Sequence, residues 1–137
     1  MKKAFLFFIL ALCSIALFAQ NVDWLWAKQA VGTDYDICRG IAVDANGNSY
    51  VTGHFDGSAT FGTTTLTSSG SYDIFVAKMD INGNWLWAKQ AGGTNEDEGI
   101  CIAINANGNS YITGFFYGSA TFGTTTLTSS GDFDIFV

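Results

Sequence analysis

The sequence predicts an all-β protein built from four-stranded antiparallel sheets, and three observations carry this prediction. WLWAKQA at 24–30 returns at 85–91, and a shift of 61 residues superimposes the chain on itself without a gap. About 39 of the 53 positions compared in this way are identical. Short runs rich in Val, Ile, Thr, Tyr, Phe and Trp alternate with Gly, Asn and Ser, and no apolar pattern has a helical period. A tandem period of this size is typical of solenoids, propellers and arrays.

Four runs in each repeat predict strands: 38–44 (CRGIAVD), 49–55 (SYVTGHF), 73–80 (DIFVAKMD) and 85–90 (WLWAKQ). Asn-Gly stands between the first two runs and again between the last two. Asn-Gly favours the type I′ turn, in which both central residues have positive φ, so each pair is predicted to form a hairpin. The longer connection between the pairs contains the β-prone TTTLT and predicts a further short strand or hairpin.

Both faces of the predicted sheet are apolar. In DIFVAKM at 73–79, Ile74 and Val76 are expected to point to one face and Phe75 and Ala77 to the other, so both faces carry apolar side chains. Trp85 and Trp87 are expected to share one face by the same parity. A sheet that is apolar on both faces packs against neighbours on both sides. Four up-and-down antiparallel strands of this kind predict a blade of a β-propeller, and the chain holds about two blades' worth.

The repeat resembles the bacterial SBBP repeats, which form β-propellers, often seven-bladed, in exported proteins. The matching residues are GIAVDANGNSYVTG at 40–53 and ATFGTTTLTSSGSYDIFVAKMDINGNWLWAKQAGGTNEDEG at 59–99, with the second copy of each. The resemblance covers essentially all of 21–137 as two tandem copies. It implies a propeller with no enzyme activity and no agreed ligand, so it carries over no functional residue.

Residues 1–19 are predicted to be a signal peptide. Lys2 and Lys3 precede an apolar run that is too short to span a bilayer, and Ala19 provides a small residue for cleavage. A signal peptide implies a protein that is secreted or held at the cell surface or in the periplasm. No second apolar segment is long enough to span a membrane.

The remaining chain, 20–137, is predicted to consist of an outer strand at 24–30, repeat one at about 32–91 and a partial repeat two at about 93–137. A propeller needs at least about four blades to close. We therefore expect either a fragment of a larger ring or a short protomer that self-associates through its unpaired edge strands.

The formal net charge is −6, and the few basic residues are scattered, so nucleic acid is excluded as a partner. His54 is the one histidine, and the sequence contains no G-x-S-x-G, phosphate loop or C-x-x-C motif. We therefore predict no catalytic residue, no metal-ligand set and no cofactor. DANGN at 44–48 and DINGN at 80–84 fail the calcium-loop pattern and are predicted to be hairpin turns.

Asp36 and Asp97 occupy equivalent positions just before the innermost strand of each repeat. They are the candidate binding residues, because acids on this rim would circle the mouth of a central channel and gather a cation. The alternative is that their side chains cap local turns. Cys38 and Cys101 fall on the innermost strands and are expected to be free, buried thiols, since such strands normally lie farther apart than the ~7 Å limit for a disulfide.

The sequence thus favours an exported, non-enzymatic scaffold or binding module whose protein or glycan ligand it does not identify. One rival is a propeller domain of a larger secreted enzyme. Another is a lectin-like sugar binder that uses its tryptophans, although their fixed places in the strands favour a packing role.

Overall fold

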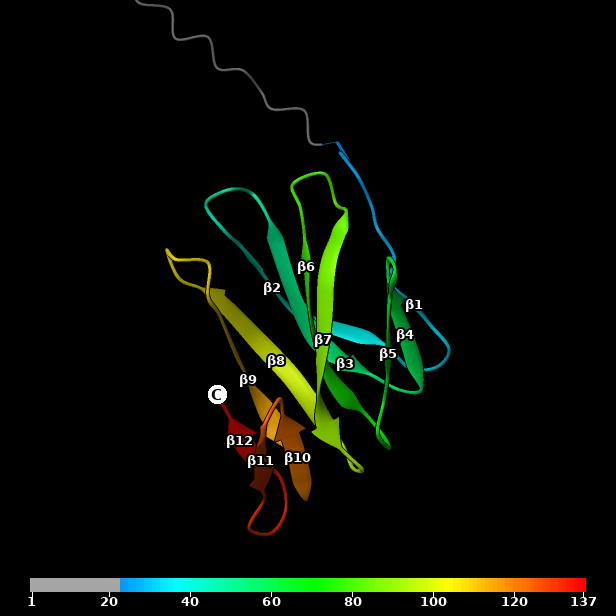
Figure 1. The fold of residues 1–137 in the computed structure, drawn as a ribbon, viewed down its shortest axis with the longest axis vertical. Coiled ribbons are helices and arrows are strands. Elements are labelled where there is room, and N and C mark those ends of the chain that lie inside the picture. The colour runs from blue at the N-terminus through cyan, green and yellow to red at the C-terminus, as the bar shows by residue number, and fades with distance from the viewer. Residues whose placement is uncertain (1–22) are drawn as a thin grey trace, which may run out of the picture.

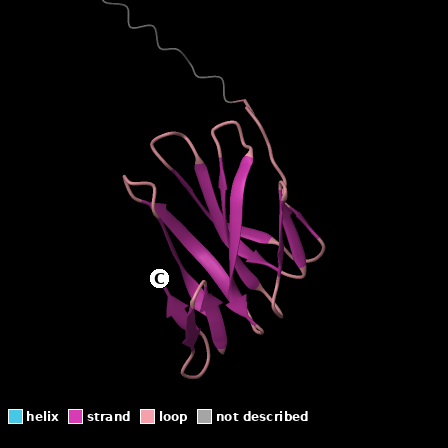
Figure 2. Cartoon of the chain, in the orientation of Figure 1, coloured by secondary structure: helices cyan, strands magenta, loops and turns pink. Residues whose placement is uncertain are grey.

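The computed structural model describes residues 23–137, which form twelve β-strands (Figures 1 and 2). The predicted signal peptide at 1–19 lies outside the described residues. The prediction that the repeats contain no helix is confirmed for 23–137, and this range contains no helix that could cross a membrane. The strands are β1 (Val31–Gly32), β2 (Ile37–Val43), β3 (Ser49–Phe55), β4 (Ser58–Phe61), β5 (Thr64–Thr67), β6 (Asp73–Met79), β7 (Trp85–Gly93), β8 (Asp97–Ile104), β9 (Ser110–Phe116), β10 (Ser119–Phe122), β11 (Thr125–Thr128) and β12 (Asp134–Phe136).

The four predicted strands of repeat one form a single up-and-down antiparallel sheet. Strand β2 pairs with β3, β3 with β6, and β6 with β7. We call this sheet the first blade. The corresponding strands of repeat two, β8, β9 and β12, pair in the same order and make the second blade. The blade prediction is confirmed.

The predicted extra hairpin is also present, and it connects successive repeats. In repeat one β4 and β5 form a hairpin that pairs with β1, and in repeat two β10 and β11 form a hairpin that pairs with the end of β7. Ala120 lies opposite Gly93, just as Ala59 lies opposite Gly32. The second hairpin therefore extends the outer strand of the first blade, and the first hairpin pairs with β1 at the equivalent position.

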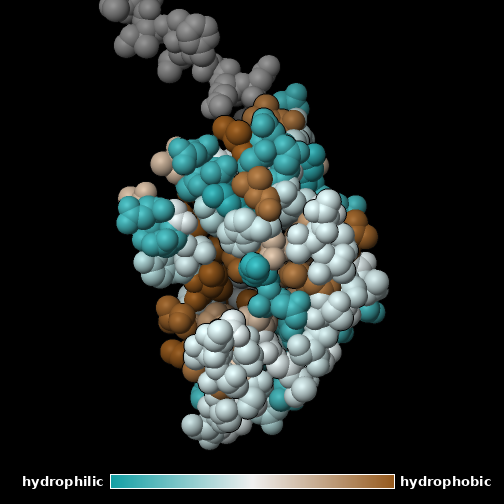
Figure 3. Space-filling view, viewed as in Figure 1, coloured by the Kyte–Doolittle hydropathy of each residue, from teal (hydrophilic) through white to brown (hydrophobic). Residues whose placement is uncertain are grey.

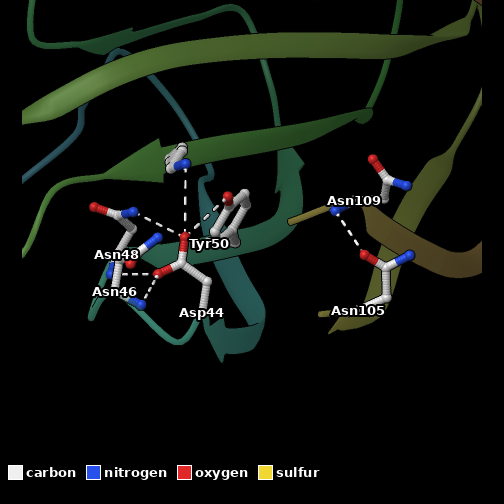
Figure 4. Close-up of polar contacts among 7 residues, drawn as sticks. Asp44, Asn46, Asn48, Tyr50, Asn105 and Asn109 are labelled. Atoms are coloured by element: carbon white, nitrogen blue, oxygen red, sulfur yellow. Dashed lines mark hydrogen bonds and ion pairs between the residues drawn. The ribbon is translucent and has the colours of Figure 1, made fainter. Parts of the chain in front are cut away.

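The Asn-Gly hairpins are formed, but the predicted type I′ turn is wrong. Gly47 has a φ of +80°, whereas no residue other than glycine has positive φ among the described residues. Gly47 N donates to Asp44 O at 3.0 Å, and Asp44 N donates to Asn48 O at 3.0 Å. This is the pattern of a three-residue loop, a type I turn followed by a left-handed glycine. The Asp44 side chain selects it by accepting hydrogen bonds from the backbone N–H groups of Asn46 and Asn48, both at 2.9 Å (Figure 4).

The expected shared face of Trp85 and Trp87 is also wrong. The pairing of β6 with β7 shifts by one residue, so that Lys78 lies opposite Trp87 and Met79 lies opposite Trp85. Neighbouring positions on β6 point to opposite faces, and this bulge therefore sends the two indoles to opposite sides of the sheet. Parity fails here because the extra residue, Leu86, resets the alternation.

Both faces of the first blade are packed. One face carries the larger core, against which Trp26, Ala30 and Trp85 pack. The other face contributes Ile74, which packs on the second repeat. The larger core consists of Val51, Phe55, Ala59, Phe61, Leu66, Phe75, Ala77, Met79 and Ala88, and the second cluster consists of Ile74, Phe116, Ala120 and Phe136. The predicted alternation along DIFV is confirmed.

The two blades meet through their inner strands. Strand β8 lies across β2, β3 and β6 (Figure 1). Gly99 leaves room for Thr52 and Ile74 of the first blade, and a Cβ placed on Gly40 would lie only 3.4 Å from the Cα of Cys101. The expected wide separation of the inner strands is therefore wrong at this point, because a residue without a side chain stands where they approach.

The cysteines are free, as predicted, but they are exposed and not buried. Each stands beside a bulge in its strand, between Cys38 and Gly40 in β2 and between Gly99 and Cys101 in β8. These irregularities lie where the two inner strands face one another, and both cysteines are exposed there.

The segment 24–30 forms no strand, and Trp24 is 88% exposed. Its identical copy at 85–91, the last strand of repeat one, is part of β7, which pairs with β6. The two copies differ because 85–91 lies beside β6, whereas 24–30 has no paired strand among the described residues. A strand requires such a neighbour to satisfy its backbone groups. Trp26 Nε1 nevertheless donates to Ile81 O at 3.1 Å, and this bond holds the segment against the first blade.

Candidate functional site

A groove opens between the two blades at the end of the sheets opposite the Asn-Gly turns. It has a volume of about 360 Å³, and we call it the rim groove. The loop from β7 to β8 forms one wall, and the loops that follow β9 and precede β12 form the other. Its lining residues are Ser71, Thr94, Asn95, Glu96, Tyr117, Asp132 and Phe133.

The rim groove presents aromatic rings beside carboxylates. Tyr117 and Phe133 are 41% and 47% exposed, and their ring centroids are 5.6 Å apart. Glu96 and Asp132 are exposed beside them, and no basic residue lines the groove. Asn95 Nδ2 donates to Tyr117 O at 3.3 Å, which connects the two walls. Such a surface can stack against a flat ligand and accept hydrogen bonds or positive charge.

The rim groove is built almost wholly from positions at which the two repeats differ. Ser71 and Asp132 are the same repeat position with different residues, and Glu96 corresponds to Tyr35. Tyr117 and Phe133 also have different counterparts, and only Thr94 is the same in both copies. The repeats are otherwise mostly identical, and five of the 14 positions at which they differ contribute residues to this groove.

A second group of differing positions surrounds the buried His54 at the blade junction. His54 of β3 is 1% exposed, and its Nδ1 lies 3.1 Å from Glu98 Oε2 of β8, within ion-pairing distance but without hydrogen-bond geometry. Arg39 of β2 contacts the same Glu98 oxygen at 3.3 Å. The rings of Tyr35 and Tyr72 flank the imidazole. Burial lowers the pKa of His54 against the opposing effect of Glu98.

Sequence reasoning set His54 aside because it is the one histidine of the chain. The signal that would have found this group is again the difference between repeats. His54 corresponds to Phe115, Glu98 corresponds to Ile37, and Arg39 corresponds to Ile100. At these three positions one repeat has an apolar residue and the other an ionisable one. Three such differences together indicate a polar contact across the junction.

The structure places the two candidate rim acids, Asp36 and Asp97, apart from one another and in different surroundings. Asp36 is exposed before β2, whereas Asp97 is fully buried at the start of β8. Asp97 Oδ2 accepts from Gly93 N at 2.7 Å, and its Oδ1 accepts from Tyr117 N at 3.3 Å. These bonds match the turn-capping interpretation. Cation binding by a ring of rim acids stays a prediction.

A third acid, Asp73, lies fully buried near Asp97. Its Oδ2 accepts from Ser69 N at 3.2 Å and from Gln90 Nε2 at 3.3 Å, and its Oδ1 has no hydrogen-bond partner. Burial raises the pKa of Asp73 to about 6, and the negative charge of Asp97 adds to the effect. A carboxyl whose pKa is higher in the folded than in the unfolded chain stabilises the fold less as pH rises through that range. Burial also raises the pKa of Asp97.

The described residues contain no group of three or more His, Cys, Asp or Glu side chains placed to hold a metal ion. They do contain the two buried carboxylates just described, from different blades.

Comparison with known proteins supports the architecture. Residues 25–54 match the family described as beta-propeller repeat, SBBP. The chain is also 27% identical over 114 residues to an uncharacterized WD repeat-containing protein, L264, of Acanthamoeba polyphaga mimivirus. That alignment covers 70% of this chain and 8% of the relative, so the chain spans a small part of the protein that it matches.

The match to a propeller repeat falls on β1, β2 and most of β3 with the segment that precedes them. The remaining strands repeat the same pattern in space. The described residues thus form an all-β, antiparallel structure of successive β-propeller blades, similar to the SBBP repeat in sequence.

Proposed function

We propose that the protein is an exported, non-enzymatic β-propeller module that acts as a scaffold and binds its ligand in the rim groove. The observation that carries this proposal is the placement of the differing repeat positions, six of the seven residues that line the groove. The residues that both repeats share maintain the blades, whereas the residues that differ determine what this one junction can bind.

A segment of another protein that contains Lys or Arg fits the groove best. Glu96 and Asp132 supply negative charge, and the exposed faces of Tyr117 and Phe133 attract cations. The chain as a whole is acidic, so its field favours the approach of a basic partner. A lectin-like role is the second candidate, because the same rings can stack on a sugar while Asn95 and Glu96 bond its hydroxyls.

The test is binding of the purified protein to arrays of Lys/Arg-rich peptides and of glycans, followed by titration of the hits. Tyr117→Ala should lower the affinity for the ligand at least about tenfold, because aromatic residues carry much of the binding energy at protein interfaces. Glu96→Gln should weaken the binding of a basic peptide, because it removes a negative charge. It should affect the binding of a neutral sugar much less, because Gln can still hydrogen-bond hydroxyl groups.

Tyr111→Ala is the matched control, because Tyr111 is an exposed tyrosine of the same blade outside the groove. It should bind as the wild type does. Equal affinity of the Tyr117→Ala and wild-type proteins for every hit would contradict the proposed site.

A further inference from the structure

Two buried carboxylates converge on the space that Gly92 leaves beside the blade junction. Asp73 begins β6 of the first blade, and Asp97 begins β8 of the second. A Cβ placed on Gly92 would lie 2.7 Å from Asp73 Oδ1 and 3.1 Å from Asp97 Oδ2. The first distance is too short for a carbon contact, so a side chain at position 92 would collide with Asp73, and the second shows that an oxygen of Asp97 faces the same space.

The Asp73 oxygen at this point lacks a donor. Oδ1 of Asp73 is buried and makes no hydrogen bond, although Oδ2 makes two. Asp73 and Gly92 line the same cavity of about 250 Å³. Its full lining is Ser69, Asp73, Gln90, Ala91, Gly92, Thr121 and Gly123. A buried carboxylate oxygen with no donor is costly to the fold unless something positive reaches it.

The hydrogen bonds favour the charged form of Asp97 more than that of Asp73. Both oxygens of Asp97 accept from backbone N–H groups, an arrangement that a protonated carboxyl would disrupt. Asp73, with one oxygen unpartnered, therefore faces a fixed negative charge. The pair needs either a proton or a cation to balance it.

Repeat comparison shows that the space is specific to this junction. Gly92 corresponds to Val31 in repeat one. Gly92 has a φ of +151°, which favours glycine, and a side chain there would collide with Asp73. Because position 92 carries glycine where position 31 carries valine, there is space where the two carboxylates meet.

We propose that Asp73 and Asp97 bind one divalent cation that prefers oxygen ligands, in the space beside Gly92. Two carboxylates supply part of the coordination of such an ion, and backbone, amide and water oxygens complete it. Because the acids belong to different blades, the ion joins repeat one to repeat two. This site is separate from the rim groove and does not depend on the proposed ligand.

The experiment is calorimetric titration of the purified protein with Ca²⁺ at pH 7.5, together with the melting temperature with and without 5 mM Ca²⁺. We expect a dissociation constant of about 10⁻⁴–10⁻³ M and a higher melting temperature with the ion. Asp73→Asn should weaken Ca²⁺ binding at least about tenfold. Without Ca²⁺ it should melt at a higher temperature than the wild type at pH 7.5 but not at pH 5, where Asp73 is protonated.

Asp134→Asn is the matched control. Asp134 is the repeat-two counterpart of Asp73 and likewise accepts a hydrogen bond from a serine N–H, that of Ser130, at 3.0 Å. This variant should bind Ca²⁺ as the wild type does. Absence of Ca²⁺ binding to the wild type would overturn the proposal in favour of a shared proton. Equal binding by wild type and Asp73→Asn would overturn it by placing the ion elsewhere.

Discussion

Replacing Trp85 with alanine should lower the free energy of unfolding by about 2–4 kcal/mol, because truncating a packed tryptophan leaves a cavity in the core. The Trp85 ring meets Phe61 edge-on, with centroids 5.1 Å apart, and packs against the larger core of the first blade. Urea unfolding followed by circular dichroism measures the loss.

Trp24→Ala is the control that the repeat itself provides. Trp24 stands at the same position of the same heptad, but it is 88% exposed. At protein concentrations low enough to prevent association, its loss should change the free energy of unfolding by less than about 0.5 kcal/mol. Equal losses for Trp24→Ala and Trp85→Ala would show that the two heptads are packed alike, against the structure.

Purified residues 20–137 should self-associate. Tyr50 is 2% exposed, whereas its counterpart Tyr111 is 54% exposed, since β7 covers the first blade and no described strand covers the second in the same way. Tyr111 lines an apolar groove of about 520 Å³ with Ile112, Phe122, Leu127 and Phe136 among its other residues. Figure 3 shows hydrophobic surface gathered beside β9 and β12.

Segment 24–30 of another copy has the sequence that would fill this groove, because it is identical to the part of β7 that covers the first blade. Each fully buried large apolar side chain is worth roughly 1.5–3 kcal/mol, so several together favour association. Light scattering after size exclusion should show species larger than a monomer, and Trp24→Ala should shift them toward the monomer. A monodisperse monomer at high concentration would count against this expectation.

The strand pattern could be read from the sequence because the repeat supplies it twice. Hydrophobic alternation in DIFV placed Ile74 and Phe75 on opposite faces, and Asn-Gly placed the hairpins correctly. The turn type was missed because the preference of Asn-Gly for a type I′ turn competes with the Asp44 side chain. Asp44 accepts hydrogen bonds from Asn46 N, Asn48 N and Asn48 Nδ2, and these bonds favour the other turn. The faces of Trp85 and Trp87 were missed because one bulge reverses parity.

The candidate sites were less accessible to sequence reasoning because they combine residues from two repeats. Asp97 was found through its repeat position, but its partner Asp73 lies 24 positions earlier in another blade. His54 and Glu98 meet only when β8 lies across β3. What the sequence does contain is the set of positions at which the copies differ, and those positions gather at the junction.

The most direct test of the account is a cross-link between the inner strands of the two blades. Gly40 and Cys101 are the same position in successive repeats, and a Cβ on Gly40 would lie 3.4 Å from the Cys101 Cα and 3.0 Å from Ile100 O, which must shift slightly. In a Cys38→Ser background, Gly40→Cys should form an intrachain disulfide with Cys101 on mild oxidation, detected by peptide mass mapping, because the two residues then lie within disulfide range. Gly131→Cys, at a position with no atom within 4 Å of its Cβ, should not. A Cys101 that stays fully alkylatable in the Gly40→Cys protein would contradict the face-to-face packing of the repeats.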